Sequence, residues 1–251
     1  MAEVNTSFCA SADGVELAVY EMGEGRPLLL LHGFFSDAAT NWIKYGHAAT
    51  LADAGFRVIM PDLRAHGQSG KPHDAAFYPP DVLADDGLAL VAHLGLADYD
   101  LGGYSLGART AARMIVRGAT PARLVLSGMG LEGLTDTARR SAHFAHLLDN
   151  LGTHERGSAL WMAEQFLKTT GGDPVALRLL IDSFVNTRDE ELSGFGLPVG
   201  VVCGTEDQDN GSAERLADAL HNARYISVPG NHMSAVTKPD LGRAFAELLG
   251  S

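Results

Sequence analysis

Short apolar runs that end in turn residues recur along the chain, and they constrain its fold more than any other feature. Near-continuous apolar runs of this length favour strands that are buried on both faces, as in a parallel sheet. The runs occupy residues 27–33, 57–63, 99–103, 122–128, 197–204 and 223–230. Segments with helical periodicity alternate with them, at residues 40–54, 80–94, 105–117, 212–221 and 239–249. This alternation predicts an α/β fold with a doubly wound, mostly parallel sheet.

Two segments depart from that rhythm. Residues 14–21 alternate apolar and polar side chains after an Asp-Gly pair, which predicts an antiparallel edge hairpin with the first few residues. Residues 131–196 contain no convincing strand, and their helix-like pieces occupy residues 135–151, 158–169 and 174–186. We therefore expect a helical cap at 131–196, inserted into a core formed by residues 1–130 and 197–251.

The stretch G-Y-S-L-G at residues 103–107 places Ser105 between two glycines, after an apolar run and before a helical pattern. A serine in this strand–turn–helix context is a candidate nucleophile. The glycines let the helix approach the strand, and the turn holds the serine in a strained conformation with its hydroxyl exposed. With 29 glycines in the chain, such a motif also arises by chance. Whether Ser105 is a nucleophile therefore depends on the presence of a base and an acid elsewhere in the sequence.

A serine hydroxyl needs a base to act as a nucleophile, and the base needs a group that orients it. His232 follows the last apolar run, in a loop, and is the best candidate base among the 10 histidines. Glu206, Asp207 and Asp209 follow the preceding run and are candidates for the orienting acid. The order of serine, acid and histidine is the one expected for a nucleophile on such a sheet.

Acyl transfer also needs N–H donors for the oxyanion that forms on the attacked carbonyl. The N–H of Leu106 directly follows the serine, and the N–H of Phe34 lies in the loop after the run at 27–33. We expect His32 to shape that loop through hydrogen bonds. Asp62, Arg64 and His66, in the stretch P-D-L-R-A-H-G-Q-S, are interpreted as residues that fix a second loop.

Five motifs occur in one order: H-G-F at 32–34, P-D-L-R-A-H-G-Q-S at 61–69, G-Y-S-L-G at 103–107, G-T-E-D at 204–207 and G-N-H at 230–232. Together they resemble the α/β-hydrolase superfamily, specifically its compact, capped esterase-like branch. The resemblance extends over nearly the whole chain and implies Ser105 as nucleophile, His232 as base and Asp207 as acid. It also implies that Phe34 and Leu106 form the oxyanion hole and that residues 131–196 are the variable cap.

The chain departs from that family after the acid. Members often have a proline there, whereas Gln208-Asp209-Asn210 follows Asp207 here. Asp209 therefore stays an alternative acid, and Glu132, at the end of the preceding strand, is a third.

The chemistry expected is cofactor-independent cleavage of a carboxylic ester through an acyl-enzyme intermediate, on a small or medium, uncharged, largely apolar substrate. The proposed pocket residues are Phe35, Tyr104, Phe144, Leu148, Trp161 and Met162, with His143 and His146 as further candidates. A lactone, a thioester or a carbon–carbon bond would suit the same three residues. A ligand-binding protein without turnover is the alternative from another class.

Composition excludes several classes of partner. The formal net charge of −12 argues against nucleic acid and against an anionic membrane. Neither a His-Glu-x-x-His metal motif nor a phosphate-binding Gly-x-x-x-x-Gly-Lys is present, so we expect no metal and no cofactor. Cys9 and Cys203 form no Cys-x-x-Cys motif, so we expect neither a redox motif nor a zinc ribbon. Without a leader or a long apolar stretch, a cytoplasmic monomer or homodimer is expected.

Overall fold

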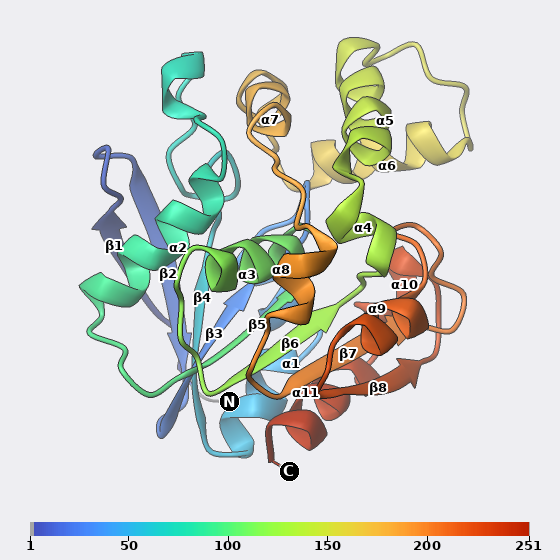
Figure 1. The fold of residues 1–251 in the computed structure, drawn as a ribbon. Coiled ribbons are helices and arrows are strands. Elements are labelled where there is room, and N and C mark those ends of the chain that lie inside the picture. The colour runs from blue at the N-terminus through green and yellow to red at the C-terminus, as the bar shows by residue number, and fades with distance from the viewer. Residues whose placement is uncertain (1–2, 251) are drawn as a thin grey trace.

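The computed structural model describes residues 3–250, and its centre is one eight-stranded sheet (Figure 1). The strands lie in the order β1-β2-β4-β3-β5-β6-β7-β8. Their bounds are β1 (Asn5–Ala10), β2 (Glu16–Met22), β3 (Arg26–Leu31), β4 (Phe56–Pro61), β5 (Asp100–Tyr104), β6 (Arg123–Ser127), β7 (Val199–Gly204) and β8 (Ala223–Val228). β2 pairs antiparallel with β1 and β4, and every pair from β4 to β8 is parallel. The predicted edge hairpin and parallel sheet are confirmed.

Helices cover both faces of the sheet, as the doubly wound prediction requires (Figure 1). On one face, Leu51 and Phe245 belong to a single apolar cluster with alternate strand residues such as Leu30. On the other face, Leu90 and Leu216 join a larger cluster. The first face carries α1 (His47–Asp53) and α11 (Asp240–Gly250), and the second carries α2 (Val82–His93), α3 (Leu106–Val116) and α9 (Ala213–Ala219).

The helix expected at residues 40–54 is interrupted. A π-helical turn, η1 (Ala39–Ile43), comes first, and α1 begins only after Gly46. Gly46 has a φ of +81°, a left-handed conformation that a helix interior does not accommodate. Gly46 therefore separates η1, which follows the loop after β3, from α1, which packs on the sheet.

The segment between β6 and β7 contains helices joined by loops and no strand. It comprises α4 (Leu131–Thr135), α5 (Thr137–Asp149), α6 (Ala159–Thr169), α7 (Pro174–Ile181) and α8 (Asp189–Ser193). Two expected helices are corrected: Asp136 separates α4 from α5, and α7 ends at Ile181 instead of continuing to 186.

α5, α6 and α7 stand above one end of the sheet in Figure 1. The Thr170 hydroxyl, directly after α6, donates a 2.7 Å hydrogen bond to the carbonyl of Phe35. This segment therefore contacts the loop that follows β3, at the carboxyl edge of the sheet. Its definition as a separate cap domain remains a prediction. Within residues 3–250, no helix combines the length and apolar character needed to cross a bilayer.

Candidate active site

Ser105 occupies a sharp turn between β5 and α3. Its φ of +54° and ψ of −111° are strained for a residue with a side chain. Any side chain at the flanking glycines would clash with the backbone. A Cβ on Gly107 would lie 2.0 Å from the Leu31 carbonyl oxygen, and one on Gly103 would lie 2.2 Å from the Gly107 backbone. The helix thus approaches the strands so closely that only glycine fits at both positions.

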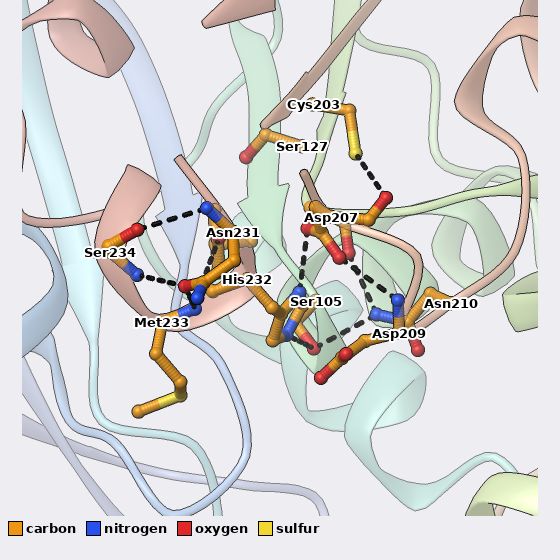
Figure 2. A network of polar contacts seen from close by, with 12 residues as sticks. Ser105, Ser127, Cys203, Asp207, Asp209, Asn210, Asn231, His232, Met233 and Ser234 are labelled. Atoms are coloured by element: carbon orange, nitrogen blue, oxygen red, sulfur yellow. Dashed lines mark hydrogen bonds and ion pairs between the residues drawn. The ribbon is translucent and has the colours of Figure 1, made fainter. Parts of the chain in front are cut away.

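His232 reaches Ser105 from the loop after β8. Its Nε2 lies 3.0 Å from the Ser105 hydroxyl oxygen (Figure 2). The side chain of Asn231 caps the short helix α10 (His232–Ala235) by accepting from two backbone N–H groups. The buried Tyr104 hydroxyl donates a 2.5 Å hydrogen bond to the carbonyl of His232. The histidine is therefore the first residue of a capped helix instead of the loop residue expected from the sequence, and its carbonyl is held by Tyr104.

Asp207 is the acid that contacts His232. Its Oδ2 lies 2.8 Å from Nδ1 of the imidazole, and the side chain is almost fully buried. Burial alone would raise the pKa of Asp207, but the hydrogen bond and charge of His232 outweigh it and hold that pKa below its ordinary value. Because Nδ1 faces the carboxylate, Nε2 is the nitrogen that faces Ser105.

The other acids considered from the sequence lie elsewhere. Asp209 forms an ion pair with Arg140 at 3.0 Å. Glu132 pairs with Arg215, and Glu206 is exposed. The backbone N–H of Asp209 donates to Asp207 Oδ1 at 3.1 Å, so this residue supports the Asp207 carboxylate through its main chain only.

The loop after β3 passes directly beside Ser105. A Cβ on Gly33 would lie 3.6 Å from Ser105 Cβ, which places the next residue, Phe34, at the edge of the site. Among the described residues, the N–H groups of Phe34 and Leu106 donate no hydrogen bond to the protein. Both N–H groups are thus free of protein acceptors beside Ser105.

Histidine and arginine side chains hold the two loops next to the site. His32 accepts from the Leu63 N–H at 2.9 Å and contacts the Gly33 carbonyl at 2.8 Å. Burial lowers the pKa of His32, so the ring is neutral, with the proton on Nδ1. Arg64 is buried among the carboxylates of Asp13 and Asp86. These contacts agree with the structural interpretation of both residues.

Asp62 and His66 complete that second loop. The Asp62 carboxylate accepts from the N–H of Ala38 at 2.8 Å and of Gln68 at 2.7 Å. His66 contacts the Arg64 carbonyl through Nδ1 at 2.9 Å. Each side chain therefore binds main-chain groups of the loops, which is a structural role.

The side chains expected to line a pocket divide into two groups. Phe144 on α5 packs against Phe34, with ring centroids 4.8 Å apart, and against Phe35 at 5.3 Å. Leu148 is buried in the same cluster, and Trp161 is partly exposed. In contrast, Met162 is 57% exposed, and His143 and His146 are exposed. Tyr104 packs against the His232 ring, with centroids 5.3 Å apart, and its hydroxyl is bonded to the His232 carbonyl. The structure thus brings neither Tyr104 nor Met162 into the cluster that contains Phe144.

Asn210 is a buried residue of the site that the sequence reasoning did not select. Its side-chain amide donates to the Gly128 carbonyl at 2.8 Å and lies 3.5 Å from the Ser105 hydroxyl oxygen (Figure 2). No motif identifies it, because its place depends on the path of the loop after Asp207. The amide thus lies at the length of a weak hydrogen bond from the Ser105 hydroxyl oxygen.

Replacing Asn210 by Ala should leave the buried Gly128 carbonyl without its donor. We expect a loss of about 1–3 kcal/mol in the free energy of unfolding and about tenfold slower labelling of Ser105 by a fluorophosphonate. The labelling rate, measured on folded protein, separates orientation of the hydroxyl from stability. Asn150→Ala, in the loop after α5, is the matched control and should change neither rate nor stability appreciably. Unchanged labelling in Asn210→Ala would rule out this positioning role.

Within residues 3–250, no group of three or more His, Cys, Asp or Glu side chains has an arrangement that could hold a metal ion. The site is therefore a serine–histidine–aspartate arrangement beside two free N–H donors, at the carboxyl ends of β3, β5, β7 and β8.

Comparison with known proteins places this geometry in a family. Residues 26–149 match the family model described as the alpha/beta hydrolase fold. The chain belongs to the α/β-hydrolase superfamily. The crystal structure of the enol-lactonase from Burkholderia xenovorans LB400 has the same fold, with a TM-score of 0.82 at 22% identity, over 98% of this chain and 100% of that one.

Two curated relatives of this α/β-hydrolase carry peroxidase names. The chain is 29% identical to the non-heme chloroperoxidase CPO-A1 of Kitasatospora aureofaciens, over 96% of this chain and 97% of that protein. It is 34% identical to the non-heme haloperoxidase of Rhodococcus erythropolis, over 51% of this chain and 49% of that protein. The second match thus spans about half of the relative's length.

Proposed function

We propose that this α/β-hydrolase is a cofactor-independent serine hydrolase that cleaves a carboxylic ester through an acyl-enzyme intermediate. The observation that carries the proposal is the continuous contact from Ser105 through His232 to Asp207, at 3.0 Å and 2.8 Å. A buried carboxylate, an imidazole and a hydroxyl in this order form the arrangement that activates a serine.

In the first half-reaction, His232 Nε2 takes the proton as the Ser105 oxygen attacks the ester carbonyl. The carbonyl carbon becomes tetrahedral, and its oxyanion accepts hydrogen bonds from the N–H groups of Phe34 and Leu106. The imidazolium is stabilised by Asp207, which stays ionised because its pKa is low. When the tetrahedral intermediate collapses, His232 donates its proton to the leaving alkoxide, and the acyl group stays on Ser105.

In the second half-reaction, water takes the place of the alcohol. His232 removes a proton from the water as its oxygen attacks the acyl carbonyl, and the same two N–H groups bind the second oxyanion. Collapse returns the proton from His232 to the Ser105 oxygen and releases the carboxylic acid. The serine hydroxyl and the neutral imidazole are thereby regenerated.

We propose that the acyl chain lies against the aromatic cluster formed by Phe34, Phe35, Phe144 and Phe184. The rings of Phe34 and Phe184 are 6.0 Å apart, and those of Phe34 and Phe35 are 4.3 Å apart. Leu148 and Trp161 extend this surface in the proposed cap at 131–196. Because one side of the cluster belongs to that segment, its residues would determine which acyl chains fit.

The names of the two relatives favour one further reaction of the same acyl-enzyme. If hydrogen peroxide replaces water as the attacking group, the acyl group leaves as a peracid, and His232 transfers the same protons. A peracid oxidises a halide without haem, which is compatible with the name non-heme chloroperoxidase. Bromination of monochlorodimedone that needs both acetate and peroxide would identify this reaction.

A panel of p-nitrophenyl esters tests the proposal. Esters of acyl chains with about two to eight carbons should release nitrophenolate, and a stoichiometric fluorophosphonate should abolish the activity and add its mass to the peptide that contains Ser105. A protein that cleaves none of these esters and takes no label would instead be the non-catalytic ligand-binding alternative.

A further inference from the structure

Three arginines of the described chain are buried, and their surroundings differ. Arg64 pairs with Asp13 and Asp86, and Arg113 is likewise flanked by two carboxylates. Arg109 is only 5% exposed, yet none of the described carboxylates forms an ion pair with it. Its Nε and Nη2 donate to a single acceptor, the Gly133 carbonyl, at 3.2 and 2.9 Å.

A buried guanidinium without a counter-ion is unfavourable, because water that stabilised the charge has been removed. Burial lowers the pKa of Arg109 to about 10, with a smaller contribution from the neighbouring charge of Arg140. The group therefore remains charged at neutral pH. Its Nη1 donates to no described acceptor and, unlike the fully enclosed unpaired atoms, keeps some accessible surface. A charge that is kept under these conditions points to a ligand.

Arg109 lies on the same face of α3 as Ser105, four residues further along the helix. Its N–H bonds to the Ser105 carbonyl at 3.0 Å. The guanidinium lies over the ring of Phe184, 5.0 Å from the centroid, and Phe184 contacts Phe34. The arginine thus borders the aromatic surface proposed for the acyl chain.

A second cation lies on the other side of that surface. Arg140 is placed over the ring of Phe144, 4.7 Å from its centroid, and Phe144 contacts Phe34. One Nη of Arg140 pairs with Asp209, but its buried Nε has no acceptor among the described residues. Asp209 is therefore the carboxylate paired with Arg140, whereas none of the described carboxylates pairs with Arg109.

Each arginine lines a different cavity. One, of about 490 Å³, is lined by Arg140, by Asn210 and by Gly133, whose carbonyl holds Arg109, and also by the acidic residues Glu132, Asp136 and Asp209. A second one, of about 20 Å³, is lined by Arg109, Leu106 and Phe184. The larger is roomy enough for a small acyl compound, and the smaller admits one water-sized polar group. Asn210 connects the larger cavity with the Ser105 hydroxyl.

We propose that Arg109 and Arg140 bind a carboxylate carried by the substrate, so that the natural ester or lactone bears a second, free acid group. This proposal rests on the proposed ester hydrolysis and defines its substrate class. Guanidinium groups bind carboxylates through paired N–H donors, and an anion beside Arg109 offsets the burial cost of a charge that no described carboxylate neutralises. This proposal differs from the expectation of an uncharged substrate, which was drawn from the apolar residues of the cap.

The test compares two esters with the same number of carbons. Mono-p-nitrophenyl adipate carries a free carboxylate, and p-nitrophenyl hexanoate does not. We expect the native protein to favour the adipate ester in kcat/KM by at least about 10-fold, and Arg109→Met to reduce that ratio by about 30-fold, as expected for one lost buried charge pair. Arg109→Lys should restore part of the ratio. Arg224→Met, an exposed arginine on β8, is the control for net charge and should leave the ratio unchanged.

The possible failures are distinguishable. If both esters are cleaved and Arg109→Met leaves their ratio unchanged, the carboxylate site is wrong while the hydrolase proposal stands. If neither ester is cleaved, the hydrolase proposal fails, and calorimetry with adipate tests the site alone: binding that Arg109→Met weakens supports it, and no binding refutes it. Arg140→Met provides a second variant should Arg109→Met not fold, and a thermal melt of each variant verifies folding.

Discussion

Ser105→Ala should lower the rate of p-nitrophenyl hexanoate hydrolysis by about 10⁴- to 10⁶-fold, because no other group can form the acyl-enzyme. The substitution removes one hydroxyl and leaves the turn intact, since the helix approach depends on the glycines at 103 and 107. Steady-state release of nitrophenolate measures the effect. Ser193→Ala, at the exposed end of α8, is the matched control and should retain full activity.

A Ser105→Ala protein that keeps more than about 1% of the native rate would contradict the nucleophile assignment. A thermal melt close to that of the native protein is required for the comparison. The oxyanion donors and the histidine remain in the variant, so a small residual rate above that of free solution is expected.

Asp207→Asn should lower kcat by about 10⁴-fold, because the amide cannot stabilise the imidazolium and can bind the wrong tautomer of His232. The comparison that decides between the acids is Asp209→Asn. Asp209 pairs with Arg140 and supports Asp207 only through its backbone, so its substitution should change hydrolysis of the neutral ester by less than about threefold. Parallel kinetics of the two variants measure both effects.

Equal losses in the two variants would mean that both carboxylates take part, and a larger loss in Asp209→Asn would reverse the assignment. The structure favours Asp207 because its carboxylate is buried against Nδ1 of His232 at 2.8 Å, whereas the Asp209 carboxylate is partly exposed.

Much of the fold follows from the sequence because burial on both faces leaves a clear pattern. Runs such as the one at 27–33 became strands of the parallel part of the sheet, offset by one or two residues. Helix interruptions were harder to predict. The break at Gly46 and the early end of α7 depend on where the chain must turn to pack, which periodicity does not record.

The candidate site also contains residues that the sequence could predict and residues that it could not. Ser105, Asp207 and His232 each follow a strand in the parallel sheet, so their meeting at one edge could be predicted from strand order. Asn210 and Arg109 could not, because the loop after Asp207 and the segment around Phe184 bring their partners from distant parts of the chain. In the sequence, Arg109 looks like any solvent-exposed arginine on a helix. What distinguishes it is the missing counter-ion, which is seen only in the structure.

The residues of the cap show why a pocket is least predictable. Trp161 and Met162 are neighbours on α6, yet Met162 points to solvent while Trp161 is partly covered. In a long inserted segment, apolar character alone does not show which face of a helix packs against the rest of the protein. The proposed lining by Phe35, Phe144, Leu148 and Trp161 therefore depends on tertiary packing that no local pattern encodes.

The central claim, an acyl-enzyme on Ser105, is tested most directly by acid quenching during turnover followed by mass spectrometry of the peptides. With p-nitrophenyl hexanoate as substrate, the account predicts a hexanoyl group on the peptide that contains Ser105 and none on that peptide in Ser105→Ala. Turnover without any acylated peptide, or acylation of a different residue, would contradict it.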